Sequence, residues 1–178
     1  MLSVQWNLLV MKELFWGLLL FIGVAMGEEL FTRGYLQGLV RVRFGAAVAI
    51  CASTLVFMLM HSFNPGMWST PLPPVNLLLV GILFGVAREV SGGLWMPIGF
   101  HLSWNFFQGN VFGFLVSGTE LESVVRIETA GSSYLSGGDF GAEGSFMTTV
   151  VLIVGIVLIY TYYITKPNHV RRRTDESI

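Results

Sequence analysis

The stretch Glu28-Glu29-Leu30-Phe31-Thr32-Arg33-Gly34-Tyr35 places three charges after an apolar segment, residues 14–27, that has no charged side chain. An ionisable side chain at membrane depth is costly, so it suggests a function and a partner. On a helix, Glu29 and Arg33 are four residues apart and can pair. Glu28 lies about 100° around the helix from Glu29 and is left without that partner. We therefore expect one neutralised carboxylate and a second, Glu28, that is available for chemistry.

The composition places the chain in a membrane. Hydrophobic residues make up 53% and charged residues 12% of the 178 residues, whereas soluble domains average about 25% charged residues. Backbone groups in lipid must be paired, and the alternation typical of a β-barrel is missing, so we expect an all-α polytopic transmembrane bundle. A single cysteine, Cys51, excludes an intrachain disulfide and a cysteine metal cluster. We expect no nucleic-acid partner.

Five apolar spans are predicted between joints that are charged, proline-rich or glycine-rich. They are Leu14–Val40, Ala46–Ser62, Val75–Val90, Leu94–Val116 and Phe146–Ile164. The chain then divides into a membrane core (1–116), a Gly-rich acidic loop (117–145), a last transmembrane helix (146–165) and a basic tail (166–178). We expect the loop to be long and mobile.

Charge asymmetry between the two sides of the membrane predicts the orientation. The side of the C-terminal tail carries Arg41, Arg43, Arg88, Lys166, Arg171, Arg172 and Arg173. The opposite side carries only Lys12 and Arg126, beside the acidic loop. We expect a cytoplasmic tail and an extracytoplasmic loop, in the cytoplasmic membrane of a prokaryote. The N-terminus would then lie outside, so we also expect that the chain either lacks upstream helices or is a short member of its class.

Strongly polar side chains recur on three of the predicted spans. Besides Glu28, they are His61 at the end of the second span and His101 and Asn105 in the fourth. His101 and Asn105 are four residues apart and share one helix face. In an otherwise apolar chain, burying such polar side chains costs the least free energy when they face one another around a water-filled cavity. We therefore expect an active site inside the bundle.

Depth estimates conflict with this single site. At 1.5 Å per residue, Glu28 lies about 18 Å, His61 about 22 Å and His101 about 10 Å from the cytoplasmic side. The spread indicates that the predicted span limits are displaced or that the helices tilt.

These side chains suit the hydrolysis of an amide by an activated water. A desolvated Glu28 would act as general base, and His61 would hold and polarise the water. His101 and Asn105 can donate hydrogen bonds to a developing oxyanion. A zinc ion held by Glu28, His61 and His101 is the alternative, although a His-Glu-x-x-His helix is missing.

Each residue also has a structural interpretation. Glu29 and Arg33 can form an ion pair that only stabilises the fold, and Asn105 can link two helices by a hydrogen bond. His61 lies beside a loop, where it can simply be solvated.

Three motifs resemble, in the same order, those of the CPBP/ABI family: Glu28-Glu29-x-x-x-Arg33, Phe57-x-x-x-His61 and His101-x-x-x-Asn105. That family comprises CAAX prenyl protease type II-like proteins and bacteriocin-processing or bacteriocin-immunity membrane proteins. The resemblance covers about residues 17–114 and does not include the loop at 119–145. Family members usually have further helices ahead of the first motif.

The resemblance implies a helical intramembrane endopeptidase of the glutamate type. Glu28 would be the water-activating base, assisted by His61, while His101 and Asn105 would form the oxyanion hole. The Glu29–Arg33 pair would orient the site. The resemblance leaves the metal open, and we expect no cofactor.

The expected substrate is a CAAX-like or other membrane-associated peptide, including a lipidated protein, with membrane lipid around it. A non-catalytic bacteriocin-immunity or scaffold protein is a second interpretation of the same motifs. A proton-coupled transporter is a third, but the short chain without an internal repeat does not favour it.

Overall fold

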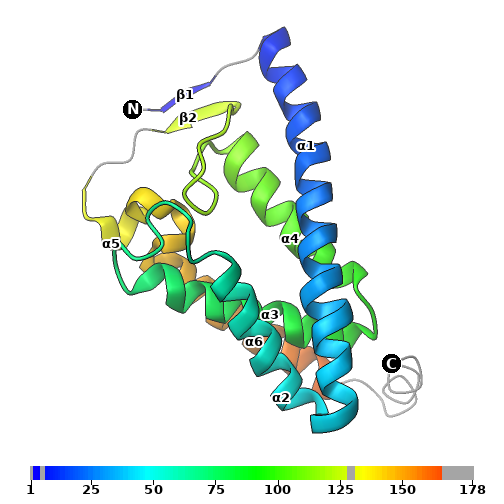
Figure 1. Cartoon of the computed structure of the whole chain (residues 1–178). Helices are drawn as coiled ribbons and strands as arrows, with labels where there is room; N and C mark the ends of the chain where they lie inside the picture. The colour runs from blue at the N-terminus through cyan, green and yellow to red at the C-terminus, as the bar shows by residue number, and fades with distance from the viewer. Residues whose placement is uncertain (1, 5–6, 128–130, 166–178) are drawn as a thin grey trace.

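The computed structural model describes residues 2–4, 7–127 and 131–165, so the predicted tail at 166–178 lies outside the described residues. Six helices carry the fold (Figure 1): α1 (Leu8–Glu29), α2 (Gln37–Met60), α3 (Leu72–Ser91), α4 (Trp95–Phe106), α5 (Ser133–Ser136) and α6 (Phe146–Thr165). Two three-residue strands, β1 (Leu2–Val4) and β2 (Val125–Ile127), pair antiparallel. The all-α class predicted from composition is confirmed.

The first helix is longer than predicted. It begins at Leu8 rather than Leu14, because the side chain of Asn7 accepts a hydrogen bond from the Val10 amide at 3.0 Å and caps it. A π-helical segment, Leu30–Leu36, joins α1 to α2 without a break. The helical path is interrupted at Gly45, whose φ of 80° and ψ of 172° suit glycine alone. The chain reverses there, at the joint expected between the first two spans.

The helices pack in two groups. Figure 1 shows α1 and α4 side by side, and α2, α3 and α6 lie together across the lower part of α1. Close approach of α1 to the chain after α4 depends on Gly17, where a Cβ would lie 2.4 Å from Asn110 Oδ1. This packing places the C-terminal half of α1, from Leu20 to Glu29, opposite α4 and opposite His61, which directly follows α2.

Among the described residues, three helical stretches are long and apolar enough to cross a membrane: Leu8–Met60, which includes the break at Gly45, Leu72–Ser91 and Phe146–Tyr163. α6 exposes the apolar side chains that a lipid-facing helix requires, among them Val150, Val151, Val154, Val157 and Leu158.

The predicted fourth span, Leu94–Val116, is wrong in extent. α4 has 12 residues and continues as a π-helical segment only to Val111, after which Gly113 adopts a positive φ of 72°.

The expected long mobile loop instead packs against the bundle. Between residues 117 and 145 it forms β2, α5 and two 3-10 turns, Gly138–Phe140 and Ala142–Gly144. Phe140 is fully buried in a cluster with Phe57, Met67 and Leu77. Because Phe57 belongs to α2 and Leu77 to α3, this segment closes over the end of the two helices.

Candidate active site

The site contains a buried ion pair between Glu29 and Arg33. Arg33 Nη1 is 3.1 Å from Glu29 Oε1, and both side chains are fully buried, so the pairing predicted from their spacing is confirmed. Arg33 Nη2 also donates to the Gly81 carbonyl of α3 at 3.2 Å, and its guanidinium lies 4.3 Å from the centre of the Phe57 ring. The pair therefore fastens the π-helical segment of the first helix to α2 and α3.

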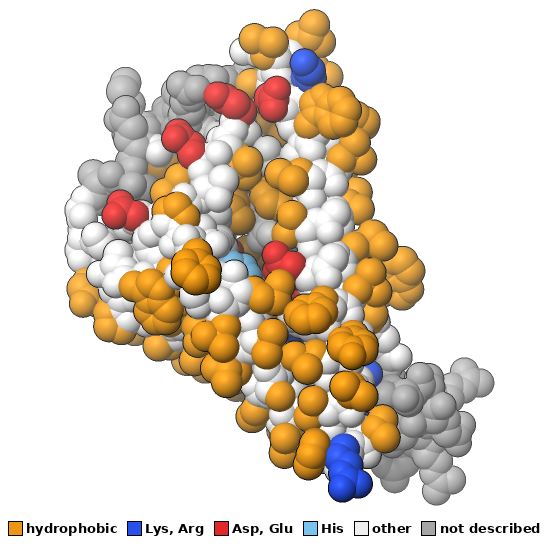
Figure 2. Space-filling view, in the orientation of Figure 1, with side chains coloured by type: hydrophobic (Ala, Val, Ile, Leu, Met, Phe, Trp, Pro, Cys, Tyr) orange, Lys and Arg blue, Asp and Glu red, His pale blue; other side chains and the backbone are white. Residues whose placement is uncertain are grey.

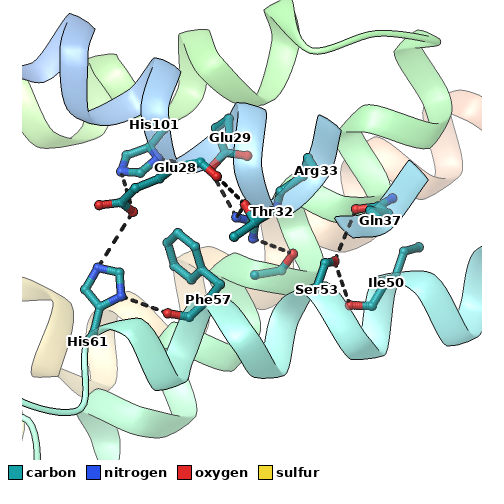
Figure 3. Close-up of polar contacts among 11 residues, drawn as sticks. Glu28, Glu29, Thr32, Arg33, Gln37, Ile50, Ser53, Phe57, His61 and His101 are labelled. Atoms are coloured by element: carbon teal, nitrogen blue, oxygen red, sulfur yellow. Dashed lines mark hydrogen bonds and ion pairs between the residues drawn. The ribbon is translucent and has the colours of Figure 1, made fainter. Parts of the chain in front are cut away.

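The Glu29 carboxylate also orients His101. Glu29 Oε1 lies 3.0 Å from His101 Nδ1 (Figure 3), and an ionised carboxylate can only accept, so Nδ1 carries the proton of this hydrogen bond. The second ring nitrogen of His101, Nε2, faces away from Glu29 and lies 4.0 Å from Glu28 Oε2. One carboxylate of the Glu28-Glu29 pair fixes the imidazole and the other faces its free nitrogen.

His61 is arranged in the same way from α2. Its Nδ1 donates to the Phe57 carbonyl at 2.9 Å, because a backbone carbonyl can only accept. In the neutral ring, Nε2 is then an acceptor, and it lies 3.9 Å from Glu28 Oε2. Both distances to Glu28 are too long for a direct hydrogen bond and are of the kind that a water molecule can bridge.

Glu28 Oε2 is a buried atom that accepts no hydrogen bond from any described residue. Leaving a buried acceptor unsatisfied costs about 1–3 kcal/mol, and more for a charged group. Such an atom is a reason to look for a ligand or reactant that completes it. Glu28 is therefore poised to receive a proton or a hydrogen bond from a molecule in the cavity.

The cavity in front of Glu28 has a volume of about 220 Å³, several times the roughly 30 Å³ that one water occupies in the liquid. Glu28, His61, His101 and Asn105 all line it. Asn105 lies on the same face of α4 as His101 and is 7% exposed. In Figure 2, acidic and histidine side chains are visible in the hollow beside α1. The remaining walls are mainly apolar, with Leu20, Phe21, Val24, Leu77, Val80 and Phe84 among them.

The donor geometry does not form a three-ligand zinc site. In the described part of the chain, no group of three His, Cys, Asp or Glu side chains is arranged to hold a metal ion. In a tetrahedral site with bonds of 2.0–2.1 Å, donor atoms are about 3.3 Å apart. The separations from Glu28 Oε2 to His61 Nε2 and His101 Nε2 are 3.9 and 4.0 Å. We therefore derive no chemical step through a metal.

The structure places Glu28, His61 and His101, whose depth estimates conflict, on one cavity together with Asn105. The depth estimates conflicted because α4 begins directly after the turn at Gly92 and packs against the C-terminal half of α1, which ends at Glu29. The depth estimates counted the same rise per residue from the predicted end of each span. Because those ends were displaced, the estimates misplaced His101 and His61 relative to Glu28.

Sequence reasoning missed the side of the cavity that the 117–145 segment supplies. Glu143 and Ser117 line it, and Glu143 Oε2 accepts hydrogen bonds from the Ser117 amide at 2.7 Å and hydroxyl at 2.8 Å. Burial raises the pKa of Glu143, while the hydrogen bonds from Ser117 and the nearby histidines act in the opposite direction. No motif distinguishes Glu143 from the other acidic residues of this segment, so the sequence contains no signal that would have found it.

A comparison with protein-family models matches residues 10–107 to the family described as type II CAAX prenyl endopeptidase Rce1-like. The match covers more than half of the 178-residue chain and contains all three motifs that suggested the resemblance. Searches of curated proteins and of solved structures found no match. The chain is an integral membrane protein that belongs to the Rce1-like family of type II CAAX prenyl endopeptidases, which are membrane proteases.

Proposed function

We propose that this protein hydrolyses a peptide bond within the membrane by means of a water that Glu28 activates. One observation carries the proposal: the unsatisfied Oε2 of Glu28 lies between His61 Nε2 and His101 Nε2, at 3.9 and 4.0 Å, on the wall of a cavity. A carboxylate between two imidazoles, in a mainly apolar enclosure, is suited to proton transfer.

The chemical steps follow from these positions. A water between Glu28 Oε2 and His61 Nε2 transfers a proton to Glu28 as its oxygen attacks the carbonyl carbon of the substrate. The new C–O bond moves an electron pair onto the carbonyl oxygen, and the Asn105 amide donates to this oxyanion. His101 donates from Nε2 when its ring carries both protons. Collapse of the intermediate breaks the C–N bond, and the proton held by Glu28 passes to the leaving amine.

Glu29 and Arg33 support this chemistry without touching the substrate. Glu29 holds Nδ1 of His101 at 3.0 Å, and Arg33 holds Glu29 at 3.1 Å. A reactive side chain needs such a partner, because a ring free to rotate would lose its alignment with the oxyanion. We therefore assign positioning roles to both residues.

The proposed substrate is a CAAX-like or other membrane-associated peptide, including a lipidated one, which reaches the cavity from surrounding lipid. Membership of a family of CAAX prenyl endopeptidases supports this class. The proposed reaction uses no cofactor, since the chain's own side chains supply the base and the oxyanion donors.

Purified protein in lipid nanodiscs, tested against fluorogenic CAAX-type peptides with and without a prenyl group, checks the proposal. Glu28→Gln should lower the cleavage rate by about 10²-fold or more, because the substitution removes the base. Glu13→Gln is the matched control, since Glu13 lies on the same helix and is not a lining residue of the cavity. Undiminished cleavage by Glu28→Gln would refute the mechanism.

Repeating the same cleavage assay with a metal chelator tests whether the reaction needs a metal ion. Cleavage should survive chelation. Loss of cleavage that added zinc restores would instead assign Glu28, His61 and His101 to ligand roles.

We also propose that the C-terminus is cytoplasmic in a prokaryotic cell. Arg41 and Arg88 both contact Glu89, at 2.8 and 2.7 Å, which gathers basic residues at one end of the bundle. A cysteine appended after Ile178 in a Cys51→Ser background should resist a membrane-impermeant maleimide in intact cells. Labelling of this cysteine before lysis would show that the C-terminus lies outside the cell and would contradict the proposed orientation.

A further inference from the structure

The charges around the cavity are unbalanced. Its described lining residues include two carboxylates, Glu28 and Glu143, and neither lysine nor arginine. Apolar walls focus the field of such charges into the space between them. A cavity of this kind favours a positively charged group over an acidic one.

Glu143 is separate from the proposed catalytic steps. Its Oε2 accepts two hydrogen bonds from Ser117, and among the described residues its side chain has no lysine or arginine partner. A partly buried carboxylate without a lysine or arginine partner has lost part of its hydration and gains from an incoming cation, because charge-assisted hydrogen bonds are strong where water is excluded.

Hydrogen bonds from α3 to the backbone carbonyls of Glu143 and Ser145 fix the position of Glu143. The side chain amide of Asn76, on α3, donates to the Glu143 carbonyl at 2.6 Å and to the Ser145 carbonyl at 2.9 Å. Asn76 in turn accepts from the Thr149 hydroxyl of α6 at 2.7 Å. A specificity residue needs such support, since a loosely held side chain discriminates poorly.

Glu143 also lies beyond residues 10–107, the part of the chain that matches the family model. The family comparison therefore assigns nothing to it, and the 117–145 segment adds this carboxylate to the cavity of the motif residues.

We propose that Glu143 is a specificity-determining residue that selects peptides with a Lys or Arg side chain next to the scissile bond. The proposal rests on the proposed function, because it names the substrate class of the same cavity. It assigns Glu143 to recognition and leaves proton transfer to Glu28.

Binding without turnover tests the proposal independently of catalysis. Full-length Glu28→Gln protein in nanodiscs is titrated with fluorescein-labelled decapeptides that differ only in a central Lys, norleucine or Glu. Glu143 is then the one carboxylate left among the described lining residues. The same titrations are run with Glu143→Gln added, and with Glu120→Gln added as control, since Glu120 is exposed on the same segment and does not line the cavity.

We expect the Lys peptide to bind about tenfold more tightly than the norleucine peptide, and the Glu peptide to bind most weakly. Glu143→Gln should abolish this preference, whereas Glu120→Gln should retain it. Gln keeps an acceptor oxygen for Ser117, and an unchanged unfolding midpoint verifies the fold. A missing Lys preference, or one that survives Glu143→Gln, overturns the proposal. Failure of the Glu28 cleavage assay would overturn only the proposed function.

Discussion

Replacing Arg33 by methionine tests whether the buried ion pair holds the site together. Arg33 and Glu29 are both fully buried and 3.1 Å apart. Methionine keeps much of the length of the side chain but leaves the Glu29 carboxylate without a cation. Removing one partner of a buried pair costs about 3–5 kcal/mol, because the remaining charge is desolvated and uncompensated. His101 still donates to Glu29, so we expect a loss near the lower end, about 3 kcal/mol.

Arg41→Met is the matched control in the same continuous helix. The Arg41 side chain is 30% exposed and contacts Glu89 at 2.8 Å. Glu89 keeps hydrogen bonds from Gln37 at 2.9 Å and Arg88 at 2.7 Å after the substitution. Solvent screening and these remaining partners limit the expected loss to about 1 kcal/mol or less.

Equilibrium unfolding in mixed micelles, followed by tryptophan fluorescence, measures both losses. Arg33→Met should lose about 2 kcal/mol more free energy of unfolding than Arg41→Met. Adding Glu29→Gln to Arg33→Met should recover part of the loss, because the uncompensated charge is removed. Equal losses for the two arginine variants would refute the reasoning that burial makes the Glu29–Arg33 pair indispensable.

Three further predictions concern close packing, backbone conformation and pH. Gly17→Ala should cost about 1–3 kcal/mol, because its Cβ would meet Asn110 Oδ1 at 2.4 Å, whereas Gly23→Ala on the same helix meets nothing within 4 Å and should not destabilise the protein in unfolding titrations. Gly45→Ala should cost about 1–3 kcal/mol in the same titrations, since its φ is 80°; an unchanged midpoint would contradict the observed break. Burial raises the pKa of Glu143 above 4.5, so the native state binds its proton more tightly than the unfolded chain, and stability should fall as the pH rises from 4.5 towards the raised pKa. Glu143→Gln should remove this part of the slope, and parallel pH–stability curves for the two proteins would contradict it.

Much of the site was predictable because it is encoded in local spacing. The four-residue interval between Glu29 and Arg33 predicts an ion pair on any helix, and the structure contains it at 3.1 Å. The same interval places His101 and Asn105 on one face of α4, and both line the cavity. The catalytic roles of these residues stay predictions until the Glu28 variant is measured.

Predictions failed where the outcome depends on contacts between distant segments. The extent of the fourth span was wrong because hydropathy continues beyond Val111, while the helix ends as the chain turns at Gly113. The 117–145 segment reads as a mobile loop because it is polar and rich in glycine. Its place in the fold depends on Phe140, which is buried against α2 and α3, and local composition does not reveal such long-range burial.

By itself, the sequence determined a membrane-embedded helical protein of the Rce1-like family with a Glu/His/His/Asn set, because hydropathy and helical spacing are local properties. Only the tertiary structure decided that Glu28 Oε2 lies 3.9 and 4.0 Å from two histidine nitrogens, since these distances depend on how α1, α2 and α4 pack. It alone decided that Glu143 enters the cavity: hydrogen bonds from Ser117 and Asn76 hold that residue in place. Both partners are far from Glu143 along the chain, so packing rather than local pattern brings them together.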